Sequence, residues 1–209
     1  MAHYGVEDFV RDYDVSRETC ARLEQFVQLL RHWNRRVNLV SKDSLNDVWR
    51  RHIADSAQLR DVIPAYEGAL IDVGSGAGFP GMVLAIMGLA DIHLIEAGAK
   101  KCVFLREAAR ITGCQVTIHN IRLGDDSASL AALPVAAIVT ARAVSPLAKL
   151  LDIVFPIVYD RTYCMFSKGM QAEDELKAAR ESWQFDVRQV PSKVEPGGVI
   201  LKINHIRRH

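Results

Sequence analysis

The chain has 209 residues, of which 49% are hydrophobic and 24% are charged, a balance typical of a globular protein with a buried core. Lysine and arginine number 26 against 25 aspartates and glutamates, so the net charge is only +1. The composition excludes a disordered, collagen-like or coiled-coil chain. Because the net charge is so small, any nucleic-acid partner must be bound by a local basic patch rather than by a global basic field.

Cysteine usage and the chain start indicate a cellular compartment. Four cysteines stand at least 12 positions apart, unlike a zinc motif or a disulfide framework: Cys20, Cys102, Cys114 and Cys164. The first 15 residues lack the apolar stretch of a signal peptide, and no apolar run approaches the roughly 20 residues of a membrane span. We therefore expect a reduced, cytoplasmic protein without a membrane partner.

Two parts of the chain differ in their sequence pattern. Residues 1–63 are charged and carry apolar residues at steps of three and four, which predicts helices near 16–37 and 46–60. Later residues alternate short β-branched runs with helical stretches. We expect an N-terminal helical extension packed on a domain formed by residues 64–209.

The second part predicts a sheet of seven strands. The expected strands are 69–73, 92–96, 116–119, 136–141, 163–167, 185–190 and 199–203, with helices at 82–87, 100–112 and 145–154. Alternating strands and helices form parallel sheets, because right-handed crossovers carry each helix over the sheet. Only a turn at 196–198 separates the last two strands, so these are expected to be antiparallel. The predicted fold is α/β, a mostly parallel, Rossmann-like seven-stranded sheet with helices on both faces.

A glycine-rich loop, IDVGSGAGFPG at 71–81, follows the first expected strand. Glycine lets the backbone approach a ligand and tolerates positive φ, and a loop between a strand and a helix is where open α/β sheets bind nucleotide-like molecules. Glu96 ends the second strand, 22 positions after Gly74, where a carboxylate can bind ribose hydroxyls. We expect a cofactor that contains a nucleoside at this edge of the sheet.

The loop matches the patterns of two cofactor classes. Gly76, Gly78 and Gly81 fit the dinucleotide pattern G-x-G-x-x-G, whereas the strand runs directly into Gly74 and makes the pattern G-x-G-x-G. Pro80 also removes an N–H group where a dinucleotide-binding helix would hold pyrophosphate. The pattern favours S-adenosylmethionine, which has no phosphate, and leaves an NAD(P)-dependent oxidoreductase as the alternative.

Other polar residues are expected near the same edge. Arg142 leaves the fourth strand, where a guanidinium can bind a carboxylate or phosphate with two hydrogen bonds, and Lys168 follows the fifth strand. His52, Asp55 and Ser56 share one helix face. This face fits either a lining of the acceptor pocket or a polar helix edge packed against the sheet, and the pattern alone favours the helix edge.

Positive charge is concentrated in two segments. Residues 31–60 carry seven basic against three acidic residues, and the helix expected at 100–112 adds a basic face. This charge fits either contacts with RNA phosphates or a solvated helix surface, and the composition does not choose between them.

Five segments together resemble the RsmG (GidB) family: RHIADS at 51–56, IDVGSGAGFPG at 71–81, LIEAGAKKCVFLRE at 94–107, ARAVSPL at 141–147 and FSKG at 166–169. Members of this family are class I, S-adenosylmethionine-dependent methyltransferases that methylate N-7 of one guanine, position 527, in 16S ribosomal RNA. The resemblance covers residues 25–203 in order. It implies an enzyme with this activity, acting as a monomer on 16S ribosomal RNA or the small ribosomal subunit. A non-catalytic rRNA-binding protein is a further alternative.

The resemblance also implies roles for individual residues. Contacts with the methyl donor are expected from Gly74, Gly76, Gly78, Phe79, Glu96, Leu123, Gly124 and Arg142. The family usually has a glutamate at the position of Gly124, and Asp125 is expected to substitute for it. Arg142, Lys168 and Asp55 are expected to act as catalytic residues that position the acceptor. No metal is implied, and no general base is needed, because N-7 of guanine carries a lone pair and no proton.

Overall fold

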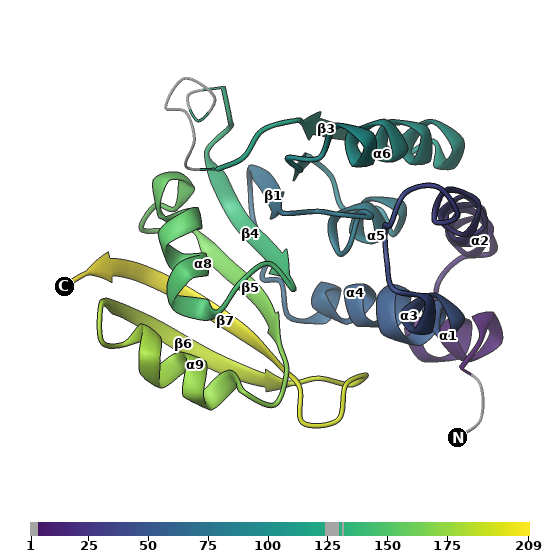
Figure 1. The fold of residues 1–209 in the computed structure, drawn as a ribbon. Helices are drawn as coiled ribbons and strands as arrows, with labels where there is room; N and C mark the ends of the chain where they lie inside the picture. The colour runs from purple at the N-terminus through teal and green to yellow at the C-terminus, as the bar shows by residue number, and fades with distance from the viewer. Residues whose placement is uncertain (1–3, 124–129, 131) are drawn as a thin grey trace.

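The computed structural model of the chain describes residues 4–123, 130 and 132–209. It confirms the predicted seven-stranded, mostly parallel sheet, with strand order β3-β2-β1-β4-β5-β7-β6 (Figure 1). The strands are β1 (Ala69–Val73), β2 (Ile92–Ile95), β3 (Val116–His119), β4 (Ala136–Arg142), β5 (Tyr163–Lys168), β6 (Trp183–Pro191) and β7 (Val199–Arg208). The first five are parallel, and β7 lies antiparallel between β5 and β6, as predicted for the closing pair.

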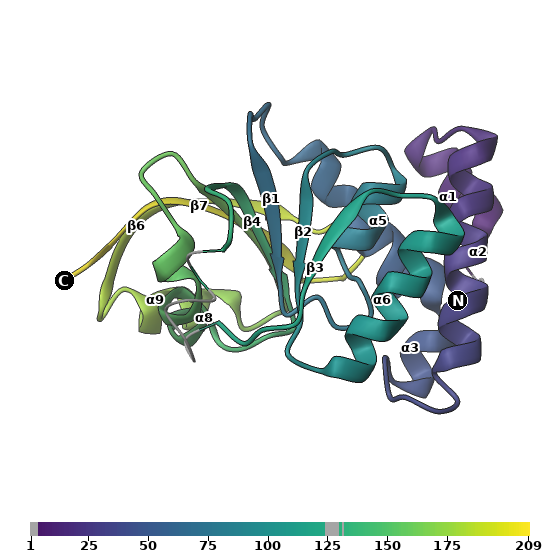
Figure 2. The ribbon, with the colours of Figure 1, turned by 90° about the horizontal axis from the view of Figure 1, so that it is seen from above.

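Helices cover both faces of the sheet. Figure 2 shows α5 (Gly81–Ile86) and α6 (Ala99–Thr112) on one side of the strands. On the other side lie α8 (Leu147–Val154) and α9 (Ala172–Ala179). The long helix α2 (Arg17–Trp33) packs against α5 and α6 from outside, so this side of the sheet carries two helical layers.

The region before the sheet is more broken than expected. The helix predicted over 46–60 consists of a π-helical turn η1 (Trp49–Ala54), one turn α4 (Asp55–Ala57) and a 3-10 turn η2 (Gln58–Asp61). The short helix α3 (Lys42–Asn46) precedes them and is capped by the Ser41 hydroxyl, which accepts a hydrogen bond from the Ser44 N–H. π-Helical turns are frequent at functional sites, where they redirect side chains that a regular helix would space differently.

Among the described residues, the five-residue helix α3 was not expected, and neither were two longer helices, α1 (Val6–Tyr13) and α9. The two longer helices have eight residues each, which is only about two turns, and two turns give too little hydrophobic periodicity to be read from a sequence.

Two hydrophobic cores lie on opposite faces of the sheet, because successive side chains of a strand point to opposite sides. One contains Leu70 of β1, Phe26 of α2 and Phe104 of α6. The other contains Ile71 of β1 and Leu151 of α8. The N-terminal helices are therefore part of the first core.

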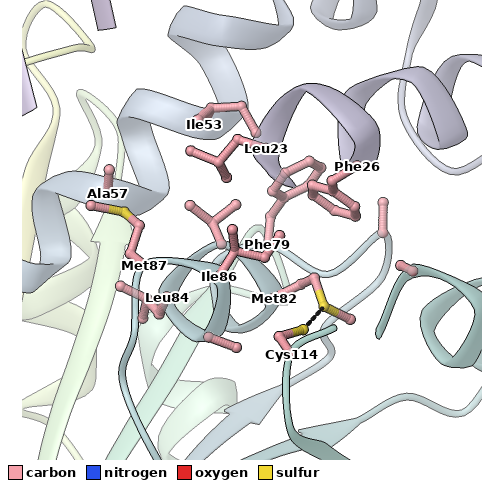
Figure 3. Packing of buried hydrophobic residues seen from close by; sticks show 14 of the residues in the cluster. Leu23, Phe26, Ile53, Ala57, Phe79, Met82, Leu84, Ile86, Met87 and Cys114 are labelled. Atoms are coloured by element: carbon pink, nitrogen blue, oxygen red, sulfur yellow. Dashed lines mark hydrogen bonds between the residues drawn. The ribbon is translucent and has the colours of Figure 1, made fainter. Parts of the chain in front are cut away.

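Figure 3 shows how this first core supports the glycine-rich loop. Leu23 and Phe26 of α2, together with Ile53 of η1, lie around Phe79 of the loop. The rings of Phe26 and Phe79 are 5.5 Å apart between centroids. The N-terminal helices thus hold one side of the loop in place, while the division of the chain at residue 63 stays a prediction.

Candidate functional site

The glycine-rich loop connects β1 to α5 at the carboxyl end of the parallel strands. Gly74, Gly76 and Gly78 all have positive φ, at 68°, 56° and 90°. This is the left-handed region in which side chains with a Cβ are strained, so the path of the loop requires glycine. Backbone atoms consequently form much of the loop surface.

Asp72 connects the loop to the sheet by hydrogen bonds. Its side chain is fully buried, and Oδ2 accepts the Gly81 N–H at 3.1 Å while Oδ1 accepts the Thr140 hydroxyl at 2.8 Å. Burial raises the pKa of Asp72 to about 6, although the hydrogen bonds from Thr140, Ser75 and Gly81 oppose the rise. One carboxyl group therefore joins β1, β4 and the start of α5.

The N–H groups at the start of α5 are already used inside the protein. Four of them donate to protein acceptors, those of Gly78, Phe79, Gly81 and Met82. Pro80, between them, has no N–H group. Pyrophosphate binding at a helix start depends on free N–H groups, so this loop fits a nucleoside without phosphates and not a dinucleotide.

Glu96 follows β2 and faces the loop. Its carboxylate accepts the N–H of Gly76 at 2.9 Å and the N–H of Gly98 at 2.7 Å, one on each oxygen. Each carboxylate oxygen can accept a second hydrogen bond, which leaves acceptors for the hydroxyls of a ribose. Asn120, which the sequence patterns did not single out, donates to the Glu96 carbonyl at 3.0 Å and holds this segment against the end of β3.

Two adjacent cavities open at this edge of the sheet. The loop cavity, of about 270 Å³, is lined by Gly74, Gly76 and Phe79. The strand-end cavity, of about 640 Å³, is lined by Ser145 and Lys168 among others. Residues lining both are Ser41, Ser44, His52, Arg142 and Ala143. These shared residues form the junction between the two cavities.

Arg142 makes three polar side-chain contacts at the junction. Nη1 donates to Asp55 Oδ2 at 3.0 Å and to the Arg51 carbonyl at 2.8 Å, and Nη2 lies 2.6 Å from His52 Nδ1. Its guanidinium stands 5.1 Å from the ring centroid of Phe79. The side chains of Arg142 and Asp55 are only 17% and 15% exposed. The structure thus brings Arg142 and Asp55 together, with most of the guanidinium hydrogen bonds directed into the protein.

His52, which the sequence pattern placed on a polar helix edge, lies between the two cavities. It is 8% exposed, and its ring stacks on Phe79 at a centroid distance of 4.6 Å and an angle of 16°. Desolvation, helped by the charges of Arg142 and Arg51, lowers the pKa of His52 to about 3. The imidazole is therefore neutral at physiological pH. The signal that points to it is its place in the RHIADS segment, not its periodicity.

We expect neutral His52 to make the stability of the protein depend on pH. In the unfolded chain the imidazole gains a proton near pH 6.5, whereas in the folded chain it stays neutral down to about pH 3. Relative to His52→Asn, the free energy of unfolding should therefore fall as the pH drops from 7 towards 4, by up to about 1.4 kcal/mol per pH unit. Urea unfolding of both proteins across this range measures the difference.

Asp72 acts in the opposite direction in that experiment. Its raised pKa means that the folded state binds the proton more tightly, so its contribution to stability grows as the pH falls through about 6. Because both proteins contain Asp72, its effect cancels in the difference. A difference that stays constant between pH 7 and pH 4 would contradict a neutral, buried His52.

Lys168 lies in another wall of the strand-end cavity and is largely buried. Its ammonium donates to the Ser145 carbonyl at 2.7 Å and pairs with Glu175 of α9 at 2.7 Å. Glu175 also accepts the Leu147 N–H at the start of α8 at 2.7 Å. Lys168 therefore joins the end of β5 to the starts of two helices, and its predicted contact with the acceptor stays a prediction.

The remaining residues expected to contact the methyl donor, Leu123 and Gly124, follow β3. Leu123 is buried among the residues of the second core, while Gly124 and Asp125 lie outside the described residues.

The part of the chain that the structure describes contains no group of three or more metal-binding side chains. Within the same residues, no helix combines the length and apolar character needed to cross a membrane.

Comparison with known sequences shows which proteins this chain is similar to. The family model described as rRNA small subunit methyltransferase G (GidB) matches residues 19–201. A protein of Rhodospirillum centenum named ribosomal RNA small subunit methyltransferase G is 46% identical over 203 residues, covering 97% of this chain and 92% of the relative. A protein of the same name from Rhodospirillum rubrum is 46% identical over 202 residues, covering 97% of this chain and 98% of the relative.

Solved structures share the fold at low identity. A mutant of MtNAS in complex with S-adenosylmethionine superposes with a TM-score of 0.55 at 13% identity, covering 96% of this chain and 83% of that chain. The ribosomal protein L11 methylase of Lactobacillus delbrueckii gives a TM-score of 0.54 at 16% identity, covering 75% of this chain and 77% of that chain. These likenesses concern the fold alone and confirm the predicted class I methyltransferase type of sheet.

Proposed function

Because the chain belongs to the rRNA small subunit methyltransferase G (GidB) family, we propose that it transfers the methyl group of S-adenosylmethionine to N-7 of a guanine in 16S ribosomal RNA. The observation that carries the cofactor assignment is the glycine-rich loop, whose helix start has no phosphate-binding character and whose neighbour is Glu96. The partner is small-subunit rRNA or the small ribosomal subunit, and we expect a monomer acting in the cytoplasm.

The reaction depends on orientation rather than on proton transfer. When bound, S-adenosylmethionine supplies a methyl carbon made electrophilic by the sulfonium. The N-7 lone pair forms the new C–N bond while the C–S bond breaks and its electron pair remains on sulfur. The protein must hold base and donor in line at close distance, and correct orientation by itself can supply much of the acceleration.

The two cavities divide this work between them. Gly74 and Gly76 line the loop cavity and, with Glu96 bonded to the Gly76 N–H, would hold the sugar and the amino-acid part of the methyl donor. Gly78 is buried and would act by shaping the loop, and Phe79 supports the junction. Leu123, Gly124 and Arg142 complete the proposed donor contacts. In the strand-end cavity, Arg142, Asp55 and Lys168 would shape the place of the base. The continuity of the two cavities through shared residues supports this division.

We expect Glu96→Gln to weaken the binding of S-adenosylhomocysteine about tenfold or more. The amide keeps the shape of the carboxylate but replaces one acceptor oxygen by a donor, which cannot accept a hydrogen bond from a ribose hydroxyl and also faces the N–H of Gly76 or Gly98. Hydrogen bonds to a charged acceptor contribute about 1.5–3 kcal/mol each, so losing one suffices for this effect. Isothermal titration calorimetry measures the affinity. Glu107→Gln on α6 is the matched control, and equal affinities for the two variants would contradict the assignment.

The activity is tested with 16S rRNA, both naked and in small-subunit particles, from a strain that lacks the modification. Labelled methyl groups should be transferred from S-adenosylmethionine, and digestion to nucleosides should release 7-methylguanosine. Titration with NADH tests the oxidoreductase alternative, and no binding is expected. Binding of NADH without binding of S-adenosylhomocysteine would overturn the proposed function.

A further inference from the structure

Two buried polar side-chain atoms lack a hydrogen-bond partner within residues 4–123, 130 and 132–209, namely Nε2 of His52 and Oγ of Ser145. Both residues line the strand-end cavity. Buried polar groups in native proteins are nearly always paired, because leaving one unpaired is costly. Because both residues belong to the wall of one cavity, a polar ligand bound there, reached by a small shift of either side chain, would supply the partner that these atoms lack.

The hydrogen on the His52 ring can be assigned from its neighbour. The Arg142 Nη2 lies 2.6 Å from Nδ1, and a guanidinium has donors only. Nδ1 must therefore accept, so a neutral ring carries its hydrogen on Nε2. Burial and two nearby arginines keep the ring neutral. His52 consequently presents one fixed donor and no second acceptor.

A fixed donor is suited to reading one purine. On guanine, N-7 and O-6 lie side by side on one edge and both accept, whereas adenine carries an amino donor in place of O-6. N-7 must keep its lone pair for the methyl group, so a donor at this edge has to address O-6. Against adenine, the same donor would meet the hydrogen atoms of the amino group and remain unpaired.

We propose that His52 is a specificity-determining residue whose Nε2–H donates a hydrogen bond to O-6 of the target guanine. The inference rests on the proposed function and adds the feature of the base that the site reads. Arg142 is then a positioning residue, because its bond to Nδ1 fixes the tautomer of His52. Phe79 stacks on the His52 ring and holds its plane, so the loop that lines the loop cavity also orients the imidazole that would contact the base.

Two variants separate the two ring nitrogens. His52→Asn places an amide oxygen near the position of Nδ1, which retains the acceptor for Arg142 but removes the donor. His52→Gln places an amide nitrogen near the position of Nε2, which retains the donor. The substrates are small-subunit particles reconstituted with 16S rRNA that carries guanosine or 2-aminopurine riboside at the target position. 2-Aminopurine keeps N-7 and lacks O-6.

The measured quantity is the ratio of kcat/KM on guanine particles to kcat/KM on 2-aminopurine particles. We expect this ratio to fall about tenfold in His52→Asn relative to the wild type, and to remain near the wild-type value in His52→Gln. Because each ratio is taken within one protein, the intrinsic reactivity of the two bases and any loss of folded protein cancel between variants.

Equal ratios in the two variants would overturn the proposal. A tenfold loss of S-adenosylhomocysteine affinity in His52→Asn would also overturn it, since the Nε2–H group would then bind the cofactor and not the base. A wild-type enzyme that forms no 7-methylguanosine on guanine particles would instead refute the proposed function, so the two failures are distinguishable.

Discussion

Gly81→Ala is expected to destabilise the protein by about 3 kcal/mol and to abolish cofactor binding. A Cβ at this position would lie 2.4 Å from Leu94 Cδ2 and 2.9 Å from both Cβ and Oδ2 of Asp72. Leu94 and Asp72 are fully buried in the neighbouring strands β2 and β1, where close packing leaves them little room to move. Any displacement of Asp72 also breaks its hydrogen bonds to the loop and to β4.

Chemical denaturation and titration with S-adenosylhomocysteine measure these two losses. Gly169→Ala is the matched control for stability, because an added Cβ there meets no atom within 4 Å. If Gly81→Ala unfolded at the denaturant concentration of the wild type and bound the ligand normally, the packing described at the start of α5 would be wrong.

Arg142→Ala is expected to lower kcat/KM for methyl transfer by about a hundredfold. The truncation removes the donor from Asp55 Oδ2, from the Arg51 carbonyl and from His52 Nδ1, and it removes the cation above Phe79. Breaking a partly buried ion pair by removing one partner costs about 3 kcal/mol or more, which corresponds to the stated factor when it falls on the transition state. The end of β4 and the segment of Arg51, His52 and Asp55 then lose the side chain that connects them across the junction.

Single-turnover methyl transfer and ligand titration test this expectation together. Arg142→Lys should recover little activity, because an ammonium cannot donate in the planar geometry of a guanidinium. Arg180→Ala is the matched control, since Arg180 lies over the Phe185 ring, 5.9 Å from its centroid, and lines neither cavity. Normal turnover in Arg142→Ala would remove this residue from the catalytic machinery.

Four of the parallel strands, β1, β2, β4 and β5, could be predicted closely because they are mostly buried, and buried strands are nearly continuous apolar runs. β1 was predicted at its observed bounds, and β2 and β4 differ by one residue at an end. β6 and β7 extend beyond the predicted 185–190 and 199–203. Their outer parts mix exposed polar residues with buried Trp183 and Ile206, so no continuous apolar run marks them in the sequence. Pairing with a neighbour, not hydrophobicity, makes those residues part of strands.

The side of the site that would bind the methyl donor was more predictable than the side that would bind the RNA base. The glycine-rich loop and Glu96 follow consecutive strands, and the carboxyl ends of parallel strands meet at one edge, so their meeting follows from local sequence and topology. The strand ends also place Arg142 and Lys168 at this edge, whereas the position of Asp55 at the acceptor and the catalytic roles of all three residues depend on family resemblance. For His52 the sequence leaves both a lining of the acceptor pocket and a polar helix edge open, because helical spacing says nothing about which neighbour a face will meet.

The amino-acid sequence by itself determined the order of the strands along the chain, the class of cofactor loop and the membership of the family. Only the tertiary structure decided the junction between the cavities, where Arg142 meets Asp55 and His52 across 87 and 90 positions of the chain. The physical reason is that periodicity and turn chemistry act over a few residues. Which polar atoms become paired, and which stay unpaired for a ligand, depends on how the π-helical turn, the loop and β4 pack together.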